Sequence, residues 1–319
     1  MKQINQRLGV LMDDIATIKP HKDSSFAMML EAQRRGYDVY TFDANDLFVE
    51  QGQVFATAGQ TRVIDQAEHY FEKSPAQVLP LGSFEVILMR KDPPFNMDYI
   101  YATYLLEQAE KQGSLVINKP SSLRDANEKL FTLNFAHCMP ATLVSSQTAQ
   151  IANFIQAQQT AVIKPLDGMG GADIFKLQHN DTDINEKINY LTDGGQHLIM
   201  AQEFLPEIVK GDKRILLING EPIDYVLARI PAEGNFKGNL AAGATGVGQP
   251  LSDSDRYLCT QVGDTLRQMG LMFVGMDVIG DRITEINVTS PTCIRELDAQ
   301  FGLNIAAELF DAIEQQLGA

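Results

Sequence analysis

The first 118 residues alternate short apolar stretches with amphipathic ones, and this order limits the folds open to the chain. Strands are predicted at residues 8–12, 37–42, 84–89 and 115–118, and helices at 24–35 and 98–111. Gly36 and Gly113 mark the ends of the two helices. Strand–helix–strand order is typical of a parallel sheet covered by helices. We therefore predict an N-terminal parallel α/β domain over residues 1–122.

The rest of the chain has a different pattern, in which strands follow one another through short turns. Strands are predicted at 161–166, 172–177, 198–204, 213–219, 222–230, 272–279 and 283–289, and helices at 253–269, 294–300 and 304–317. The dipeptide Asn219-Gly220 between two of these strands is a strong hairpin signal. This largely antiparallel arrangement indicates an α+β domain over residues 123–319. The predicted fold class is therefore α/β and α+β within one chain.

The chain carries a formal net charge of −15, which excludes several classes of partner. An acidic surface repels a phosphate backbone, so we expect neither nucleic acid nor an anionic membrane as a partner. No apolar run approaches the length of a membrane span, and the first residues lack the apolar core of a signal peptide. The three cysteines, Cys138, Cys259 and Cys293, form no CxxC pair. This usage is typical of the reducing cytosol, so we expect a cytoplasmic protein.

An apolar strand at 161–163 ends in Lys164, and the glycine-rich segment 167–171 follows at once. Glycine lets backbone N–H groups approach phosphate oxygens closely, and a lysine can add positive charge to the same phosphates. An ordinary hairpin turn with a solvated lysine would have the same sequence. The chain contains no Gly-Lys dipeptide, which excludes a Walker A loop. A strand rather than a helix is expected around Asp173, which argues against a dinucleotide-binding fingerprint.

Carboxylate and amide side chains interrupt the two apolar strands near the C-terminus. Glu285 and Asn287 are two residues apart on one strand and therefore point to the same face. A two-residue turn at 280–281 would set Asp277 opposite Thr284, so only an odd number of loop residues is expected to bring Asp277 opposite Glu285. Hard oxygen ligands of this kind suit Mg²⁺. A solvated acidic strand face is the alternative, although carboxylates are rarely buried without a partner.

Residues 231–248 form a long glycine-rich stretch without hydrophobic periodicity. Loops of this length in a compact domain are usually lids over a site, and a tolerated surface insertion is the alternative. Arginine side chains can also clamp substrate carboxylates. The candidates are Arg90, Arg214, Arg229 and Arg295, and for each one alone a surface ion pair is an equal alternative.

Several motifs resemble those of ATP-grasp ligases and occur in the same order. They are Lys164 with the glycines after it, the segments 200–206 and 211–214, and the tetrapeptide 284–287. Longer stretches resemble more narrowly the prokaryotic glutathione synthetase family, namely 89–95, 164–172, 238–243 and 287–296. The resemblance extends from Leu8 over nearly the whole chain. It implies an N-terminal α/β substrate-binding domain followed by a two-lobed ATP-grasp domain, with a lid near 231–248.

The resemblance implies a role for each matching residue. The nucleotide would be bound by Lys129, Lys164, Gly168, Gly170, Gly171, Gln202, Glu203, Phe204, Leu205 and Asp212, with 202–205 as the hinge over adenine and Asp212 near the ribose. The catalytic residues would be Lys164, Arg229 and Asn239, and the substrate-binding residues Arg90, Arg214, Arg229, Ser290 and Arg295. Two Mg²⁺ ions, with Mn²⁺ as an alternative metal, would be held by Asp277, Glu285 and Asn287. Lys237 departs from the lid arginine of the family pattern, and lysine keeps the charge but loses bidentate geometry.

The activity implied by the resemblance is ATP-dependent ligation of γ-glutamylcysteine to glycine through an acylphosphate, which forms glutathione, ADP and phosphate. A homo-oligomer, dimeric or tetrameric, is implied by the family alone. Two alternatives stay open: another ATP-grasp ligase that joins different amino acids or peptides, and a catalytically silent ATP-binding regulatory module. Intact Asp277, Glu285 and Asn287 count against the silent module, because nucleotide binding alone tolerates the loss of a metal ligand better than phosphoryl transfer does.

Overall fold

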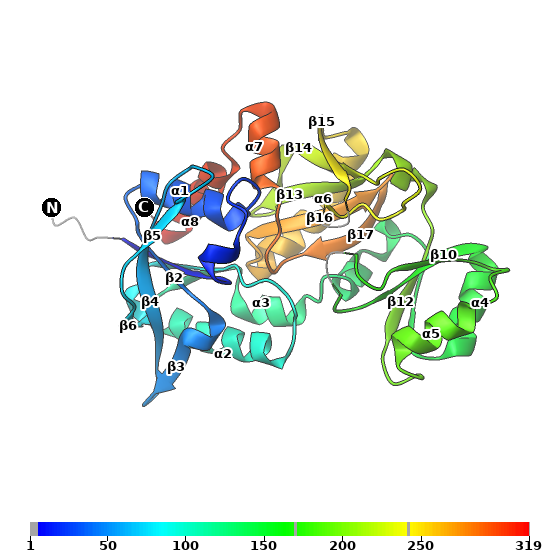
Figure 1. Ribbon diagram of the computed structural model, residues 1–319, viewed down its shortest axis with the longest axis horizontal. Coiled ribbons are helices and arrows are strands. Elements are labelled where there is room, and N and C mark those ends of the chain that lie inside the picture. The colour runs from blue at the N-terminus through cyan, green and yellow to red at the C-terminus, as the bar shows by residue number, and fades with distance from the viewer. Residues whose placement is uncertain (1–5, 169–170, 241–242, 319) are drawn as a thin grey trace.

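The computed structural model describes residues 6–168, 171–240 and 243–318, which form three β-sheets with helices packed on them (Figure 1). The sheets follow one another along the chain. The C-terminal helix α8 (Ile305–Leu317) returns to contact α1 (Ser24–Arg34) at the N-terminal end. This architecture confirms the predicted combination of α/β and α+β.

The first sheet has a parallel centre, as the N-terminal pattern predicted. Its strands are β1 (Arg7–Leu11), β2 (Asp38–Phe42), β3 (Leu47–Glu50), β4 (Gln53–Val63), β5 (Phe71–Lys73), β6 (Gln77–Pro80), β7 (Val86–Met89) and β8 (Leu115–Ile117). β1 runs parallel to β2 and β7, and β7 runs parallel to β8. β4 lies antiparallel to β2, β3, β5 and β6, in a region for which no secondary structure was predicted. Helices α1, α2 (Met97–Lys111) and α3 (Pro120–Asp125) complete this part.

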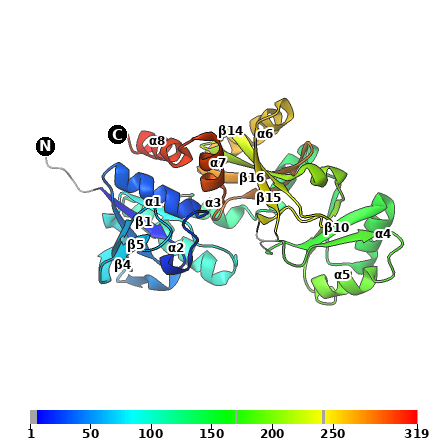
Figure 2. The same cartoon turned by 45° about the horizontal axis from the view of Figure 1, so that its top comes forward.

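The second sheet is a small antiparallel layer covered by two helices. Its order is β11-β10-β12-β9, formed by β9 (Thr142–Ser145), β10 (Thr160–Pro165), β11 (Phe175–Gln178) and β12 (Ile199–Glu203). Helices α4 (Thr148–Gln158) and α5 (Ile184–Thr192) pack on it through Ile151, Ile155 and Ile188. This core is separate from the two cores that the first and third sheets share. The second sheet with α4 and α5 therefore projects as a lobe of its own (Figure 2).

The third sheet is antiparallel and carries most of the chemically interesting side chains. Its order is β15-β14-β13-β16-β17, formed by β13 (Asp212–Ile218), β14 (Glu221–Ile230), β15 (Thr245–Pro250), β16 (Phe273–Ile279) and β17 (Arg282–Asn287). Helices α6 (Asp253–Met269) and α7 (Ile294–Phe301) pack on β14. The turn between β13 and β14 has the predicted two residues, and both Asn219 (φ 49°) and Gly220 (φ 79°) have positive φ, as a type I′ hairpin requires.

One strand lies where the sequence predicted only a loop. β15 takes up Thr245–Pro250, the last part of the predicted lid, and pairs with β14. Its alternate glycines hide the strand pattern from a reading of the sequence. Gly248 is required by close packing, because a Cβ there would lie 2.3 Å from the ring of Phe301. The last residues of the predicted lid therefore belong to a strand of the third sheet.

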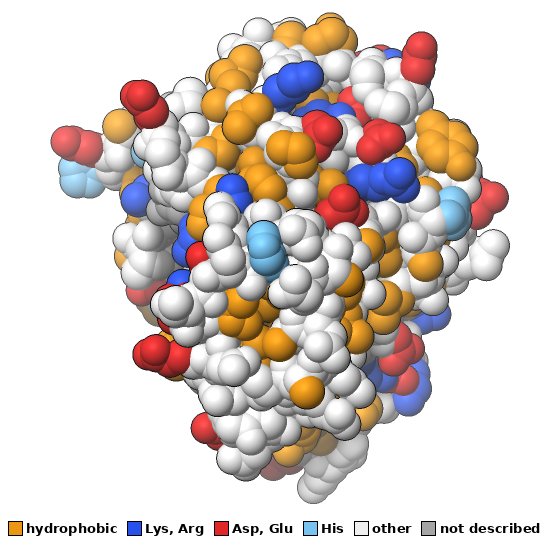
Figure 3. Space-filling model, turned by 90° about the vertical axis from the view of Figure 1, so that its right-hand side faces the viewer, with side chains coloured by type: hydrophobic (Ala, Val, Ile, Leu, Met, Phe, Trp, Pro, Cys, Tyr) orange, Lys and Arg blue, Asp and Glu red, His pale blue; other side chains and the backbone are white. Residues whose placement is uncertain are grey.

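The acidic side chains that give the chain its net negative charge are dispersed over the surface. Figure 3 shows acidic side chains scattered singly or in small groups over the face that includes α4 and α5. Within the described residues, no helix combines the length and apolar character needed to cross a bilayer.

The contact between α1 and α8 depends on Glu31, a carboxylate that is 4% exposed. Hydrogen bonds from Arg34, and then from Arg35 and Asn304, lower the pKa of Glu31 from 4.5 to about 2 despite its burial. Because the pKa of Glu31 is lower in the folded chain than in the unfolded chain, its ionised carboxylate stabilises the fold. This stabilisation is complete above about pH 4.5 and is lost as the pH falls through about 2.

We expect Glu31→Gln to lower the free energy of unfolding by about 1.5–3 kcal/mol at pH 7, the size typical of charged hydrogen bonds. Urea denaturation at pH 7 and at pH 3 measures this difference. The difference between the variant and the unmodified chain should shrink at pH 3. A difference that is the same at both pH values would contradict the assigned role.

Candidate active site

A cavity of about 340 Å³ lies between the second and third sheets. Its charged lining residues are Asp92, Glu128, Lys129, Lys164, Glu203, Asp212, Arg214, Arg229, Lys237, Asp277 and Glu285. Cations and carboxylates are nearly balanced in this lining although the whole chain is strongly acidic. The cavity can therefore hold an anionic ligand that the outer surface would repel.

Asp277 on β16 is the centre of the charged lining. Arg214 on β13 lies directly opposite it in the sheet and donates two hydrogen bonds, of 2.5 and 3.0 Å. Arg229 on β14 contacts Asp277 Oδ2 at 2.9 Å and Asp212 Oδ2 at 2.5 Å. Burial alone would raise the pKa of Asp277, but the two guanidinium groups outweigh it and lower this pKa to about 2. Asp277 is therefore a charged carboxylate in the interior.

Asp212 has the opposite electrostatic balance. Burial raises its pKa to about 7, because the attraction of Arg229 offsets only part of the desolvation cost. Its Oδ1 atom is buried and has no hydrogen-bond partner among the described residues. Such an atom is an acceptor that a ligand hydroxyl can satisfy.

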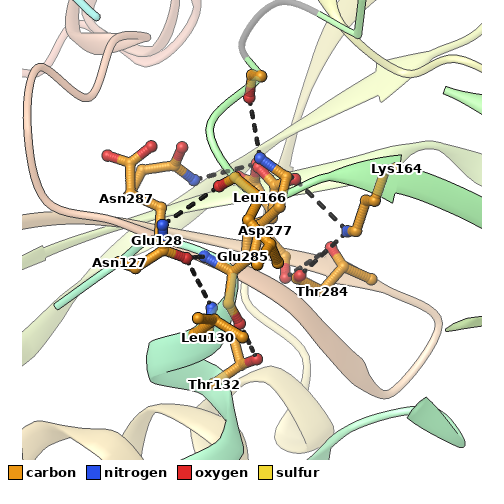
Figure 4. Close-up of polar contacts among 12 residues, drawn as sticks. Asn127, Glu128, Leu130, Thr132, Lys164, Leu166, Asp277, Thr284, Glu285 and Asn287 are labelled. Atoms are coloured by element: carbon orange, nitrogen blue, oxygen red, sulfur yellow. Dashed lines mark hydrogen bonds and ion pairs between the residues drawn. The ribbon is translucent and has the colours of Figure 1, made fainter. Parts of the chain in front are cut away.

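Two lysines reach the same cavity from different elements. Lys164 at the end of β10 lies 3.4 Å from the carbonyl oxygen of Thr284 and 3.5 Å from Glu285 Oε1 (Figure 4). Lys129 donates to the carbonyl of Gly168 at 2.8 Å and lies 3.6 Å from Glu285. Burial lowers the pKa of Lys164, and the nearby Glu285 carboxylate offsets part of this effect. Both ammonium groups can therefore meet phosphate oxygens in the cavity.

The register of β16 and β17 differs from the prediction. The turn has only two residues, 280 and 281, yet Asp277 lies opposite Glu285. The expectation that this pairing needs an odd loop was wrong, because Thr284 is an extra residue in β17 and forms a β-bulge. The bulge turns Glu285 and Asn287 to the face of Asp277, and it exposes the Thr284 carbonyl to Lys164.

The segment 288–294 runs from the end of β17 into α7 and is held by side chains that lie much earlier in the chain. Glu128 Oε1 accepts hydrogen bonds from the backbone N–H groups of Val288 and Thr289 and from the Thr289 hydroxyl, at 2.9–3.1 Å. Asn118 donates to the carbonyl of Val288, and Arg90 donates to the carbonyl of Pro291, both at 2.8 Å. Sequence reasoning missed Glu128, since its partners are about 160 residues away and no local pattern marks it.

The glycine-rich turn and the predicted lid lie against each other. Lys237 donates to the carbonyl of Gly171 at 2.8 Å, and a Cβ on Gly171 would lie 2.6 Å from Asn239 Oδ1. Gly238 packs on Asp212, where a Cβ would lie 2.4 Å from the Asp212 Cβ. Gly168, Gly171 and Asn239 all line the cavity, whereas Gly170 lies outside the described residues.

The predicted hinge, 202–205, covers the last two residues of β12 and the two residues after it. All four of its residues line the cavity, with Pro140, Val162, Ile174, Ile208 and Ile279 beside them. The backbone N–H groups of Glu203 and Phe204 bond to the carbonyls of Ala141 and Thr160. Apart from Gln202 and Glu203, the residues at this end are apolar, in contrast to the charged residues around Asp277.

The predicted substrate-binding residues divide into two groups. Arg214, Arg229 and Ser290 line the cavity, and Ser290 donates to Asp92 at 2.5 Å. Arg90 is 7% exposed and is not part of the lining, but it donates to Ser25 and to the carbonyl of Pro291, which does line the cavity. Arg295 forms an ion pair with Asp65 at 2.7 Å, also outside the lining. The structure therefore places Arg295 apart from the other predicted site residues, and Arg90 behind the lining, in contact with it through Pro291.

Comparison with known proteins identifies the family. Residues 6–124 match the N-terminal domain of prokaryotic glutathione synthetase, and residues 128–302 match the ATP-grasp domain of the same family. Glutathione synthetase of Coxiella burnetii is 53% identical over 98% of this chain and 97% of its own. Glutathione synthetase of Escherichia coli K12 is 51% identical over 98% of both chains.

The chain belongs to the prokaryotic glutathione synthetase family. It is thus an ATP-dependent carboxylate–amine ligase. Among solved structures, the D-cycloserine synthetase DcsG covers 98% of this chain and 99% of its own, with a TM-score of 0.68 and 16% identity. The ATP-grasp ligase PsnB in complex with a phosphomimetic precursor variant, Mg and ADP has a TM-score of 0.65 and 19% identity over 98% of this chain and 99% of its own. These structures share the ATP-grasp fold of the family.

Asp277 and Asp224 offer a matched test of the charged cluster, since each carboxylate lies 2.9 Å from an arginine. The Asp277 side chain is 4% exposed and the Asp224 side chain 75%. We expect Asp277→Asn to lower the free energy of unfolding by about 3–5 kcal/mol, because two buried guanidinium groups lose their common counter-ion. Asp224→Asn should cost less than about 1 kcal/mol. Equal and small losses in chemical denaturation would show that Asp277 does not stabilise the cluster.

Proposed function

We propose that this chain ligates γ-glutamylcysteine to glycine and converts ATP to ADP and phosphate, which makes glutathione. The observation that carries the proposal is its identity of 51–53% with glutathione synthetases over 98% of the chain. Fold alone would not select this reaction, since a D-cycloserine synthetase and peptide-binding ATP-grasp ligases share the fold at 15–19% identity. The charged cavity supports phosphoryl transfer, because its five cations come from five different segments of the chain around one space.

In the first step, a carboxylate oxygen of the donor attacks the γ-phosphorus of ATP, and the bond to the bridging oxygen breaks to release ADP. Lys129 and Lys164 would neutralise the phosphates, and Asp212 Oδ1 would accept from a ribose hydroxyl. The backbone around Gly168 and Gly171 would follow the phosphates closely. These groups act by position and charge, which is the usual contribution of a protein to phosphoryl transfer.

In the second step, the glycine amine attacks the acylphosphate carbonyl, the amine loses a proton, and phosphate leaves. Arg229 and Asn239 would stabilise the oxygen that becomes negative in the tetrahedral intermediate. Cys293 lines the cavity but has no task in this route, which needs no protein nucleophile, and burial raises the pKa of its thiol. The lid around Lys237 would exclude water, which hydrolyses acylphosphates.

The donor set around Asp277 fits a divalent cation. Among the described residues, no three His, Cys, Asp or Glu side chains lie together as a metal site on their own. Asp277 and Glu285 would therefore act with the Asn287 amide and with phosphate oxygens, the mixed set that Mg²⁺ prefers. Two Mg²⁺ ions, or Mn²⁺ in their place, would neutralise the charge that develops on the transferred phosphoryl group.

γ-Glutamylcysteine carries two carboxylates, and Arg214 and Arg229 are the cavity arginines that suit them. Ser290 would contribute a hydroxyl, and Arg90 and Arg295 would act on the same substrate from outside the present lining. We further propose a cytoplasmic enzyme that assembles as a dimer or tetramer, with residues 1–122 and 123–319 as its two domains. The three buried, unpaired cysteines suit a reducing compartment.

The reaction is tested by phosphate release with three substrate sets: γ-glutamylcysteine with glycine, D-alanine alone, and glutamate with cysteine. We expect ATP- and metal-dependent release with the first set. Lys164→Met should reduce it by about 100-fold or more, because a buried charge facing the phosphates is lost. Lys187→Met removes a lysine of α5 in the same lobe, which pairs with Asp183 at the start of that helix, and it should leave the rate unchanged.

Phosphate release with one of the other two substrate sets, and not with γ-glutamylcysteine and glycine, would keep the ligase assignment and refute glutathione synthesis. Tight ATP binding without turnover on any set would favour a regulatory module.

A further inference from the structure

The apolar end of the cavity contains a buried amide. Gln202 on β12 is 4% exposed and lines the cavity beside Val162, Phe204 and Leu205. An amide has two chemically different halves, an NH₂ group that donates and an oxygen that accepts. The half that faces the ligand decides which ligand atoms this end of the cavity can accept.

The sheet register places one hydroxyl beside this amide. Thr142 on β9 and Val162 on β10 both lie directly opposite Gln202, one on each side. Residues opposite one another in a sheet have side chains on the same face. Thr142, Gln202 and Val162 therefore form one row, of which Gln202 and Val162 reach the cavity.

The hydrogen bonds of Thr142 fix the orientation of the amide. The carbonyl of Pro140 can only accept, and it takes the Thr142 hydroxyl proton at 2.9 Å. The Thr142 oxygen then acts as an acceptor, and it receives a hydrogen bond from Gln202 Nε2 at 3.1 Å. With its NH₂ group bonded to Thr142, Gln202 is left with its oxygen as the half that faces the cavity.

We propose that Thr142 is a specificity-determining positioning residue, which turns Gln202 so that the site prefers a purine with a 6-amino group over one with a 6-oxo group. A 6-amino group donates a hydrogen bond to the Gln202 oxygen. A 6-oxo group would place its oxygen against the Gln202 oxygen. Both atoms are acceptors, so neither would receive a hydrogen bond. The inference rests on the proposed placement of the nucleotide base at residues 202–205.

The test compares the binding of ATP and ITP, which differ at position 6 of the base. Calorimetry without donor or acceptor substrate gives both dissociation constants. Thr142→Val keeps the shape of the side chain and removes the hydroxyl, so Gln202 is no longer held in one orientation. We expect the preference for ATP over ITP to fall about threefold to tenfold, the range of one neutral hydrogen bond.

Two further variants separate positioning from a general structural effect. Thr142→Ser keeps the hydroxyl and should keep the preference for ATP. Gln202→Met removes the amide and should lower the preference, and Thr142→Val should then add nothing in this background because the two residues act as one unit. Thermal unfolding of each variant checks that the fold is intact.

The proposal is overturned if folded Thr142→Val keeps the original preference, or weakens ATP and ITP binding equally. It is also overturned if the effect of Thr142→Val persists in the Gln202→Met background. Because the readout is nucleotide binding alone, a chain that binds ATP but joins substrates other than γ-glutamylcysteine and glycine would refute the proposed function and still decide this question.

Discussion

Asp277 is a buried carboxylate between two guanidinium groups, and the arrangement of the cavity depends on this contact. Removing three charges from water is costly unless each one is paired. The register of the third sheet provides these pairs, because it places Arg214 opposite Asp277 and Arg229 opposite Asp212. The same charges give the cavity a nearly neutral lining within an acidic protein. Fold and function are thus linked through the register of three adjacent strands.

The segment 288–294 connects this sheet to the N-terminal part of the chain. Its hydrogen-bonding partners include Arg90 and Asn118 from the first part of the chain and Glu128 from the link to the second sheet. Glu128 is next to Lys129, which faces Glu285. A shift of this segment would therefore change the position of a lysine and a carboxylate together. The first and third sheets also share their cores, whereas the second sheet has its own and is the part best suited to move as a lobe.

Local patterns predicted most of the elements that carry the site. The helix at 253–269 was predicted in full, because Ser252 caps its start and Gly270 ends it. The glycine-rich turn after Lys164 and the pair Glu285 and Asn287 were also identified from the sequence. The α4 and α5 helices were not, and α5 lacks a side-chain cap at its start.

The remaining features depend on contacts that no local pattern records. Hairpin register could not be deduced from the length of its turn, since the bulge at Thr284 adds a residue inside the strand. The roles of Arg90 and Arg295 could not be separated from those of Arg214 and Arg229, because their partners lie far away in the sequence. β15 was hidden by glycines that are present for close packing.

The Thr284 bulge brings Glu285 and Asn287 to the face of Asp277, where we propose that the three side chains hold a divalent cation. Glu285→Gln keeps the bulge and the size of the side chain but removes a carboxylate from this face. Asp281→Asn is the matched control, because it removes a carboxylate that is 71% exposed from the turn between the same two strands. Binding of Mn²⁺ in the presence of a non-hydrolysable ATP analogue, followed by electron paramagnetic resonance, compares the two variants. We predict that Asp281→Asn binds Mn²⁺ like the unmodified chain, and that folded Glu285→Gln loses at least about tenfold in affinity. Equal Mn²⁺ affinity in folded Glu285→Gln and in the unmodified chain would contradict the assignment of Glu285 as a metal ligand.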